Sequence, residues 1–65
     1  MTIEEARIGT RVMSLVEFSG VPIHTQGIID EDYDTGVMVA WNLSDGSPLR
    51  DGFDKETDLK YLTVL

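Results

Sequence analysis

The chain has no cysteine, two prolines and a single histidine among its 65 residues. Without cysteine there can be no disulfide framework, no thiolate zinc site and no cysteine nucleophile, so packing must hold the fold together. The apolar runs are only a few residues long, far short of the roughly 20 residues that span a bilayer. The N-terminal stretch, with Glu4 and Glu5, shows no secretory leader, and we therefore expect a cytoplasmic protein.

Basic side chains are also scarce, because five Lys and Arg stand against twelve Asp and Glu, for a formal net charge of −7. A nucleic-acid surface needs clustered Lys and Arg to neutralise phosphates. Here the bases are scattered along the chain, as Arg7, Arg11, Arg50, Lys55 and Lys60. Nucleic acid is thus disfavoured as a partner, and a basic protein or peptide is the better match. The simpler interpretation is that the acidity keeps a small domain soluble.

What the chain does contain is the composition of one folded unit, since an apolar content of 42% suits a single compact core. We treat residues 1–65 as one domain. Short apolar runs separated by turn residues, with no helical period, predict an all-β fold, a small SH3-like barrel of about five short strands. Thr2 and Glu5 have the spacing of a capping box, which predicts a short N-terminal helical turn.

Runs of β-branched and apolar residues predict strands at residues 11–16, 27–31, 37–42 and 60–65. The alternation is clearest in the third run, where Val37, Val39 and Trp41 fall on one face, which we expect to be core. In the last strand we expect Leu62 and Val64 to point inward.

Two long connections are predicted between these strands. Residues 17–26 contain turn-forming residues, but Phe18, Val21 and Ile23 supply apolar side chains that we expect to fold onto the barrel. Residues 43–52 contain a proline and two Asp-Gly pairs, which predicts a loop of ten residues. A short fourth strand around Phe53 then follows.

The acidic residues do not form a recognisable metal or catalytic site. An EF-hand loop that starts at Asp30 needs glycine at its sixth position and glutamate at its twelfth, where Thr35 and Trp41 stand. The acidic run from Asp30 to Asp34 is therefore interpreted as a solvated hairpin turn. The later carboxylates alternate with basic residues, and we expect weak surface ion pairs there.

His24 is the only histidine, and no serine has the context of a nucleophile elbow, so a catalytic triad is not supported. A transition-metal site also lacks ligands, because there is no second His and no Cys. We therefore expect no enzymatic activity, no catalytic residue, no metal and no cofactor.

The aromatic residues are the candidates for binding a partner. Phe18 and Tyr33 fall on predicted loops, and a shallow patch between the first loop and the hairpin would suit an extended or proline-rich peptide. The predicted partner-binding residues are Phe18, His24, Tyr33 and Trp41. In the alternative interpretation, Phe18 and Tyr33 simply cap the two ends of the barrel.

From residue 8 to residue 65 the order of features resembles small KOW-type and related SH3-like domains. The resemblance is carried by Gly9-Thr10-Arg11-Val12, by the turn from Pro22 to Gly27, by the Val37 to Trp41 strand and by residues 53–62. The chain is especially similar to short bacterial and phage-encoded domains of unknown function with a G-T-R-V opening and a V-x-W strand. The resemblance implies a fold and no specific activity. His24 stands where such domains often have glycine.

These observations lead to a non-enzymatic binding module for a protein or peptide as the first hypothesis. The alternative is a nucleic-acid-associated domain of the KOW type, or an acidic mimic of nucleic acid that occupies a basic groove on another protein. The position of the charges in the fold discriminates between them. We expect an outward face of the sheet to carry Met13, Leu15 and Met38. Because small barrels can pair through such apolar faces, we expect a monomer or a weak homodimer.

Overall fold

The computed structural model describes residues 1–43, 45–46 and 48–65. Within them, five strands form one antiparallel sheet. The strands are β1 (Arg11–Ser14), β2 (Gln26–Asp32), β3 (Gly36–Asn42), β4 (Pro48–Asp54) and β5 (Leu62–Val64). One 3-10 turn, η1 (Leu59–Tyr61), precedes β5. No helix in this described part is long and apolar enough to cross a membrane.

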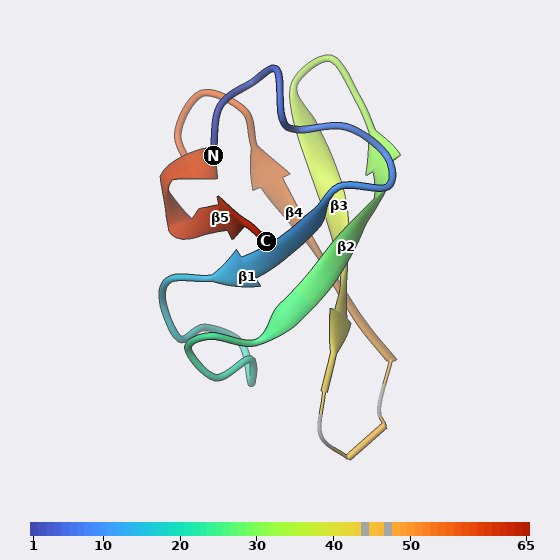
Figure 1. The fold of residues 1–65 in the computed structure, drawn as a ribbon, viewed down its shortest axis with the longest axis vertical. Helices are drawn as coiled ribbons and strands as arrows, with labels where there is room; N and C mark the ends of the chain where they lie inside the picture. The colour runs from blue at the N-terminus through green and yellow to red at the C-terminus, as the bar shows by residue number, and fades with distance from the viewer. Residues whose placement is uncertain (44, 47) are drawn as a thin grey trace.

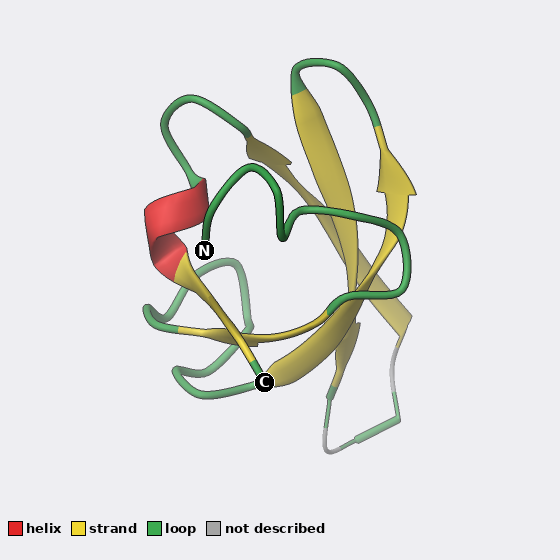
Figure 2. Cartoon of the chain, turned by 45° about the horizontal axis from the view of Figure 1, so that its top comes forward, coloured by secondary structure: helices red, strands yellow, loops and turns green. Residues whose placement is uncertain are grey.

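The strand order is β4-β3-β2-β1-β5, so the first four strands form consecutive hairpins and the last returns to pair with the first. The 3-10 turn carries the chain from the end of β4 across the open side of the sheet to β1 (Figures 1 and 2). The sheet curls around its core, with β4 and β5 as its two edges. The predicted fold class, an all-β SH3-like barrel of five short strands, is confirmed.

The core lies inside the curl of the sheet and receives side chains from every strand. Its buried members are Ala6, Val12, Val21, Ile29, Val37, Val39, Trp41, Phe53, Leu59 and Leu62. The alternation in β3 is confirmed, because Val37, Val39 and Trp41 are at most 4% exposed. Each fully buried aliphatic side chain of this kind stabilises the fold by about 1.5–3 kcal/mol.

The long first loop is held against β1 by a buried serine. Ser14 is completely buried at the end of the strand. Its hydroxyl donates to the Pro22 carbonyl oxygen at 3.0 Å and accepts from the Thr25 amide at 3.0 Å. The predicted first strand is therefore two residues too long, because the chain after Ser14 leaves the sheet.

Of the apolar residues of the first loop, Val21 is buried as predicted. Ile23 is 51% exposed, so its predicted inward position is wrong.

Glycine is required where β2 crosses β3. A Cβ atom on Gly27 would lie 2.8 Å from the Ala40 carbonyl oxygen and 2.8 Å from Cε3 of Trp41. Real Cβ atoms essentially never approach other atoms so closely. The absent side chain thus lets the Trp41 ring pack directly against the β2 backbone.

The N-terminal turn has the predicted capping box. The Thr2 amide donates to the Glu5 carboxylate at 2.8 Å, and the Glu5 amide donates to the Thr2 hydroxyl at 3.3 Å. The reciprocal pair closes one hydrogen-bonded turn, which places Ala6 in the core.

The fourth strand is the main correction. Of the loop predicted over residues 43–52, positions 44 and 47 lie outside the described residues, and Pro48–Asp54 forms the whole of β4. Pairing with β3 is continuous from Asn42 opposite Pro48 to Gly36 opposite Asp54. Proline is tolerated at the first residue of an edge strand, because no hydrogen bond of the sheet is lost there. The turn-forming residues of this segment therefore led to the wrong prediction of a loop.

Val64 lies opposite buried Val12 but stays 37% exposed, because β5 is the other edge of the sheet.

Candidate ligand-binding groove

Three aromatic rings lie together beside a concavity that combines apolar and acidic side chains. Phe18, Trp41 and Phe53 contact one another edge to face, with ring centroids 5.4–6.0 Å apart. Such contacts add about 0.5–1.5 kcal/mol beyond the area they bury. Phe18 comes from the first loop, where its backbone exchanges two hydrogen bonds with Val21. A short loop segment is thereby fixed against the two strands β3 and β4.

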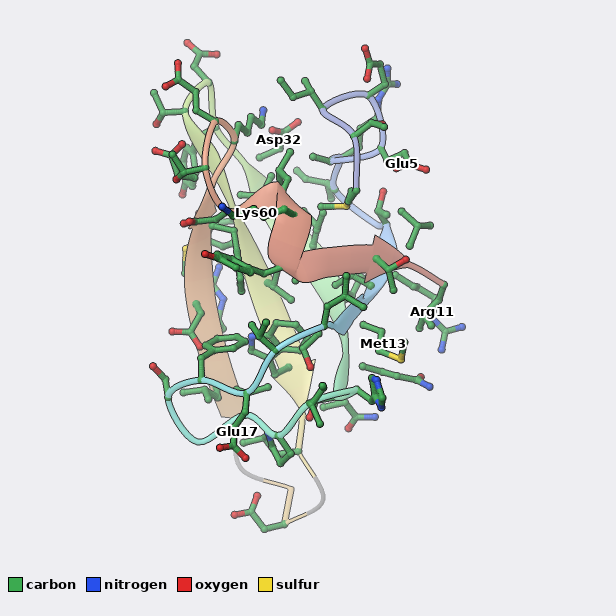
Figure 3. The ribbon with its side chains drawn as sticks, turned by 90° about the vertical axis from the view of Figure 1, so that its left-hand side faces the viewer. Glu5, Arg11, Met13, Glu17, Asp32 and Lys60 are labelled. Atoms are coloured by element: carbon green, nitrogen blue, oxygen red, sulfur yellow. The ribbon has the colours of Figure 1, made fainter. Side chains whose placement is uncertain are left out.

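A cavity of about 380 Å³ opens beside these rings, between the first loop, β4 and η1. Its lining consists of Val16, Phe18, Ser19, Asp51, Gly52, Phe53, Asp58 and Tyr61. We call this cavity the groove. Figure 3 shows the side of the molecule that bears it, with Lys60 above and Glu17 below. The groove is thus assembled from three segments that are far apart in the sequence.

Asp51 occupies a position in β4 that belongs to the inner face of the sheet. In the pairing with β3 it lies opposite Val39, which is fully buried, and its neighbours on the same face are Leu49 and Phe53. An apolar side chain is expected at such a position. The Oδ2 atom of Asp51 is buried and has no hydrogen-bond partner among the described residues. The same is true of Nε1 of Trp41, which lies diagonally across the strand pair.

The second carboxylate of the groove is already engaged. Asp58 accepts hydrogen bonds from the Asp54 amide at 3.0 Å and from the Thr57 hydroxyl at 3.1 Å. It therefore stabilises the turn that leads into η1. At the rim, Lys60 holds its ammonium 5.3 Å from the centroid of the Tyr61 ring, within the range of a cation–π contact. Asp51 is the carboxylate of the groove that retains an unused, buried acceptor atom.

The structure brings together two of the four predicted partner-binding residues. Phe18 and Trp41 are in contact, although Trp41 is only 4% exposed and lies behind the groove wall. His24 is exposed, with a φ of 68°, and lines a separate depression beside Pro22. Tyr33 is 55% exposed at the β2–β3 turn, at the opposite end of the molecule from the first loop (Figure 1). The predicted patch between Phe18 and Tyr33 is therefore not formed.

Sequence reasoning missed the contributions of Asp51 and Tyr61 to the groove. The signal for Asp51 was present as an acid in the middle of an alternating Leu49, Asp51, Phe53 pattern. It was obscured because Asp51-Gly52 is also a common turn sequence. Tyr61 reaches the groove only because η1 folds across the open side of the sheet, which no local pattern predicts.

The acidic run on β2 is neutralised on the outer face of the sheet. A bulge shifts the register between Ile29 and Glu31, so that two successive carboxylates, Asp30 and Glu31, reach one guanidinium. Arg50 contacts Asp30 at 2.9 Å and Glu31 at 2.7 Å. The hydrogen bonds from Arg50 hold the pKa of Asp30 below its ordinary value of 3.8.

Lys55 binds the next acid along β2, Asp32, at 2.6 Å. Two of the five basic side chains are thus paired with carboxylates of the acidic run. Across the described ranges, no three His, Cys, Asp or Glu side chains come together as a metal site.

No protein-family model, curated protein or solved structure matches this chain.

Proposed function

We propose that this domain is a non-enzymatic interaction module that binds a segment of a partner protein in the groove beside Phe18 and Tyr61. The observation that carries the proposal is the combination of aromatic walls with the carboxylate of Asp51 in one concavity; its Oδ2 is buried and has no hydrogen-bond partner in the described part of the chain. Protein-binding sites are enriched in such aromatic anchors, because they bury a large area at a small cost in side-chain entropy.

The volume of the groove supports an extended peptide as its ligand. A cavity of about 380 Å³ has room for one or two side chains and not for a globular surface. The three segments that line it come from a loop, a strand and a turn, all held by hydrogen bonds or ring contacts. A groove that exists before binding reduces the ordering cost of association.

Direct binding of nucleic acid is less well supported. Arg50 and Lys55 are paired with carboxylates, and Lys60 is placed over the Tyr61 ring. A phosphate backbone would have to compete with these partners and with a net charge of −7. A mimic of nucleic acid needs an acidic surface that is not paired with basic side chains. Arg50 pairs with carboxylates of the acidic run on the outer face, so this run does not favour mimicry.

Selection from a random dodecapeptide library, followed by NMR mapping of the selected peptides on the ¹⁵N-labelled chain, tests the proposal. We expect the affected amides to surround the groove. Tyr61→Ala should weaken binding about tenfold or more, as for an interface hot spot. Tyr33→Ala is the matched control, because it removes an exposed tyrosine at the opposite end and should leave affinity unchanged. Failure to select any peptide, or binding that depends on Tyr33 and not on Tyr61, would contradict the proposal.

A further inference from the structure

The unusual feature of the groove is the acid at an inward-facing position of β4. A buried carboxylate oxygen without a donor is costly, and folded proteins pair nearly all such atoms. Asp51 lies opposite Val39 and between Leu49 and Phe53 on the same face, where a valine or leucine would complete the core. Asp51 is only half-buried as a residue, but its covered Oδ2 finds no donor among the described residues. A cationic ligand that pairs with this carboxylate offsets that cost.

The chemistry of the groove specifies the donor. It must be small enough to enter the groove that Phe18, Asp51 and Tyr61 line, and it must carry its proton on a positively charged group to match the carboxylate. Lys and Arg side chains meet both conditions, since their alkyl stems pack on apolar surface while the charged end forms hydrogen bonds. Aromatic rings beside the path also favour a cation.

We propose that the groove recognises a lysine or arginine side chain of the partner segment, whose charged end pairs with the carboxylate of Asp51. This inference rests on the proposed function, and it adds the identity of the side chain that is recognised. Asp58 takes no direct part, because its carboxylate is engaged within the turn before η1. Its negative charge still favours a cation nearby. The net charge of −7 guides basic segments toward the domain.

A rival explanation involves Trp41. Its buried Nε1 also lacks a partner, and Trp41 and Asp51 are diagonal neighbours on the inner face of the β3–β4 pair. A small rearrangement that let the indole donate to the carboxylate would satisfy both groups without any ligand. The experiment must therefore report on the indole N–H as well as on the ligand.

Titration of the ¹⁵N-labelled full chain with Nα-acetyl-lysine N-methylamide tests the inference. The arginine, norleucine and Nε-trimethyl-lysine analogues serve as parallel probes. We expect the lysine or the arginine probe to shift amides around the groove. The norleucine probe, which lacks the charge, should bind about tenfold more weakly or worse. The trimethyl-lysine probe keeps the charge but has no N–H, so it should also lose affinity.

Two variants complete the experiment. Asp51→Asn keeps the shape of the side chain and should reduce affinity for the lysine probe about tenfold or more. Asp34→Asn removes the same charge at the β2–β3 turn, where the side chain is exposed, and should leave affinity unchanged.

Equal binding of the lysine and norleucine probes, or no shift in the groove with either cationic probe, would overturn the inference. So would an Asp51→Asn variant that shifts the Trp41 indole resonance and keeps its affinity for the lysine probe. These outcomes leave the proposed function standing if library peptides still bind the groove in a Tyr61-dependent manner. The two proposals can therefore fail separately.

Discussion

Replacement of Asp51 by valine should make the domain more stable while it destroys the proposed recognition of a cation. The variant removes a buried acceptor for which the described ranges supply no donor, which relieves a penalty of about 1–3 kcal/mol. It also places a β-branched side chain opposite Val39, in the face that already holds Leu49 and Phe53. For a domain of this size, 1 kcal/mol moves the melting temperature by about 4–8 °C. We therefore expect an increase of about 5–20 °C.

Urea unfolding followed by Trp41 fluorescence measures the effect, because the buried indole is the only tryptophan of the chain. Asp34→Asn is the control for the loss of one negative charge, which by itself reduces self-repulsion. Asp51→Asn keeps a polar group at the inward position and should gain less than Asp51→Val. A valine variant that is less stable than the wild type would refute the reasoning, since it would show that the carboxylate has a stabilising partner within the fold.

Three further substitutions test the fold around the groove. Gly27→Ala should destabilise the domain by about 1–3 kcal/mol through overpacking against β3, whereas Gly52→Ala, which meets only a methionine sulfur at 3.4 Å, should be close to neutral in the same urea titration. Ser14→Ala should cost about 1–3 kcal/mol, because it removes two hydrogen bonds of a buried hydroxyl, one to the Pro22 carbonyl oxygen and one from the Thr25 amide, and hydrogen exchange should increase in the first loop. Arg50→Gln should lower the urea midpoint at pH 7, and the difference should shrink as the pH falls below 3.8, because Arg50 lowers the pKa of Asp30 in the fold and that stabilisation is lost as the carboxylate is protonated.

The central hairpin and the core were predictable because their local and tertiary requirements agree. The alternation of Val37, Val39 and Trp41 is a local pattern, and the fold buries that same face. The capping box of Thr2 and Glu5 is likewise local and is found as predicted. In both segments the conformation that the local sequence favours is the one that the tertiary fold requires, so the sequence alone was enough to predict it.

The fourth strand was not predictable because its sequence and its environment disagree. Asp51-Gly52 is a common turn sequence, and Pro48 lacks an amide proton, yet continuous pairing with β3 holds the whole segment as a strand. An edge position tolerates these residues, since only one side of β4 has to form hydrogen bonds. That β4 is an edge follows from the topology, which a window of residues does not contain.

The candidate site depended still more on topology. Phe18 and Tyr33 are both loop aromatics in the sequence, but the curl of the sheet sends them to opposite ends (Figure 1). Tyr61 instead completes the groove, because η1 crosses the open side of the sheet. Sequence reasoning paired Phe18 with Tyr33, whereas in the fold Phe18 lines the groove together with Tyr61.

The position of an acidic side chain in the fold says more about its role than the number of acidic residues in the chain does. Acids on the outer face, such as Asp30 and Asp32, cost little because they meet water or the bases Arg50 and Lys55. Their presence is explained by solubility and by weak pairing. Asp51 faces inward, where a carboxylate opposes folding unless something satisfies it. If Asp51→Val raises the stability as expected, folding alone does not account for the carboxylate, and the proposed pairing with a cationic ligand gives it a role.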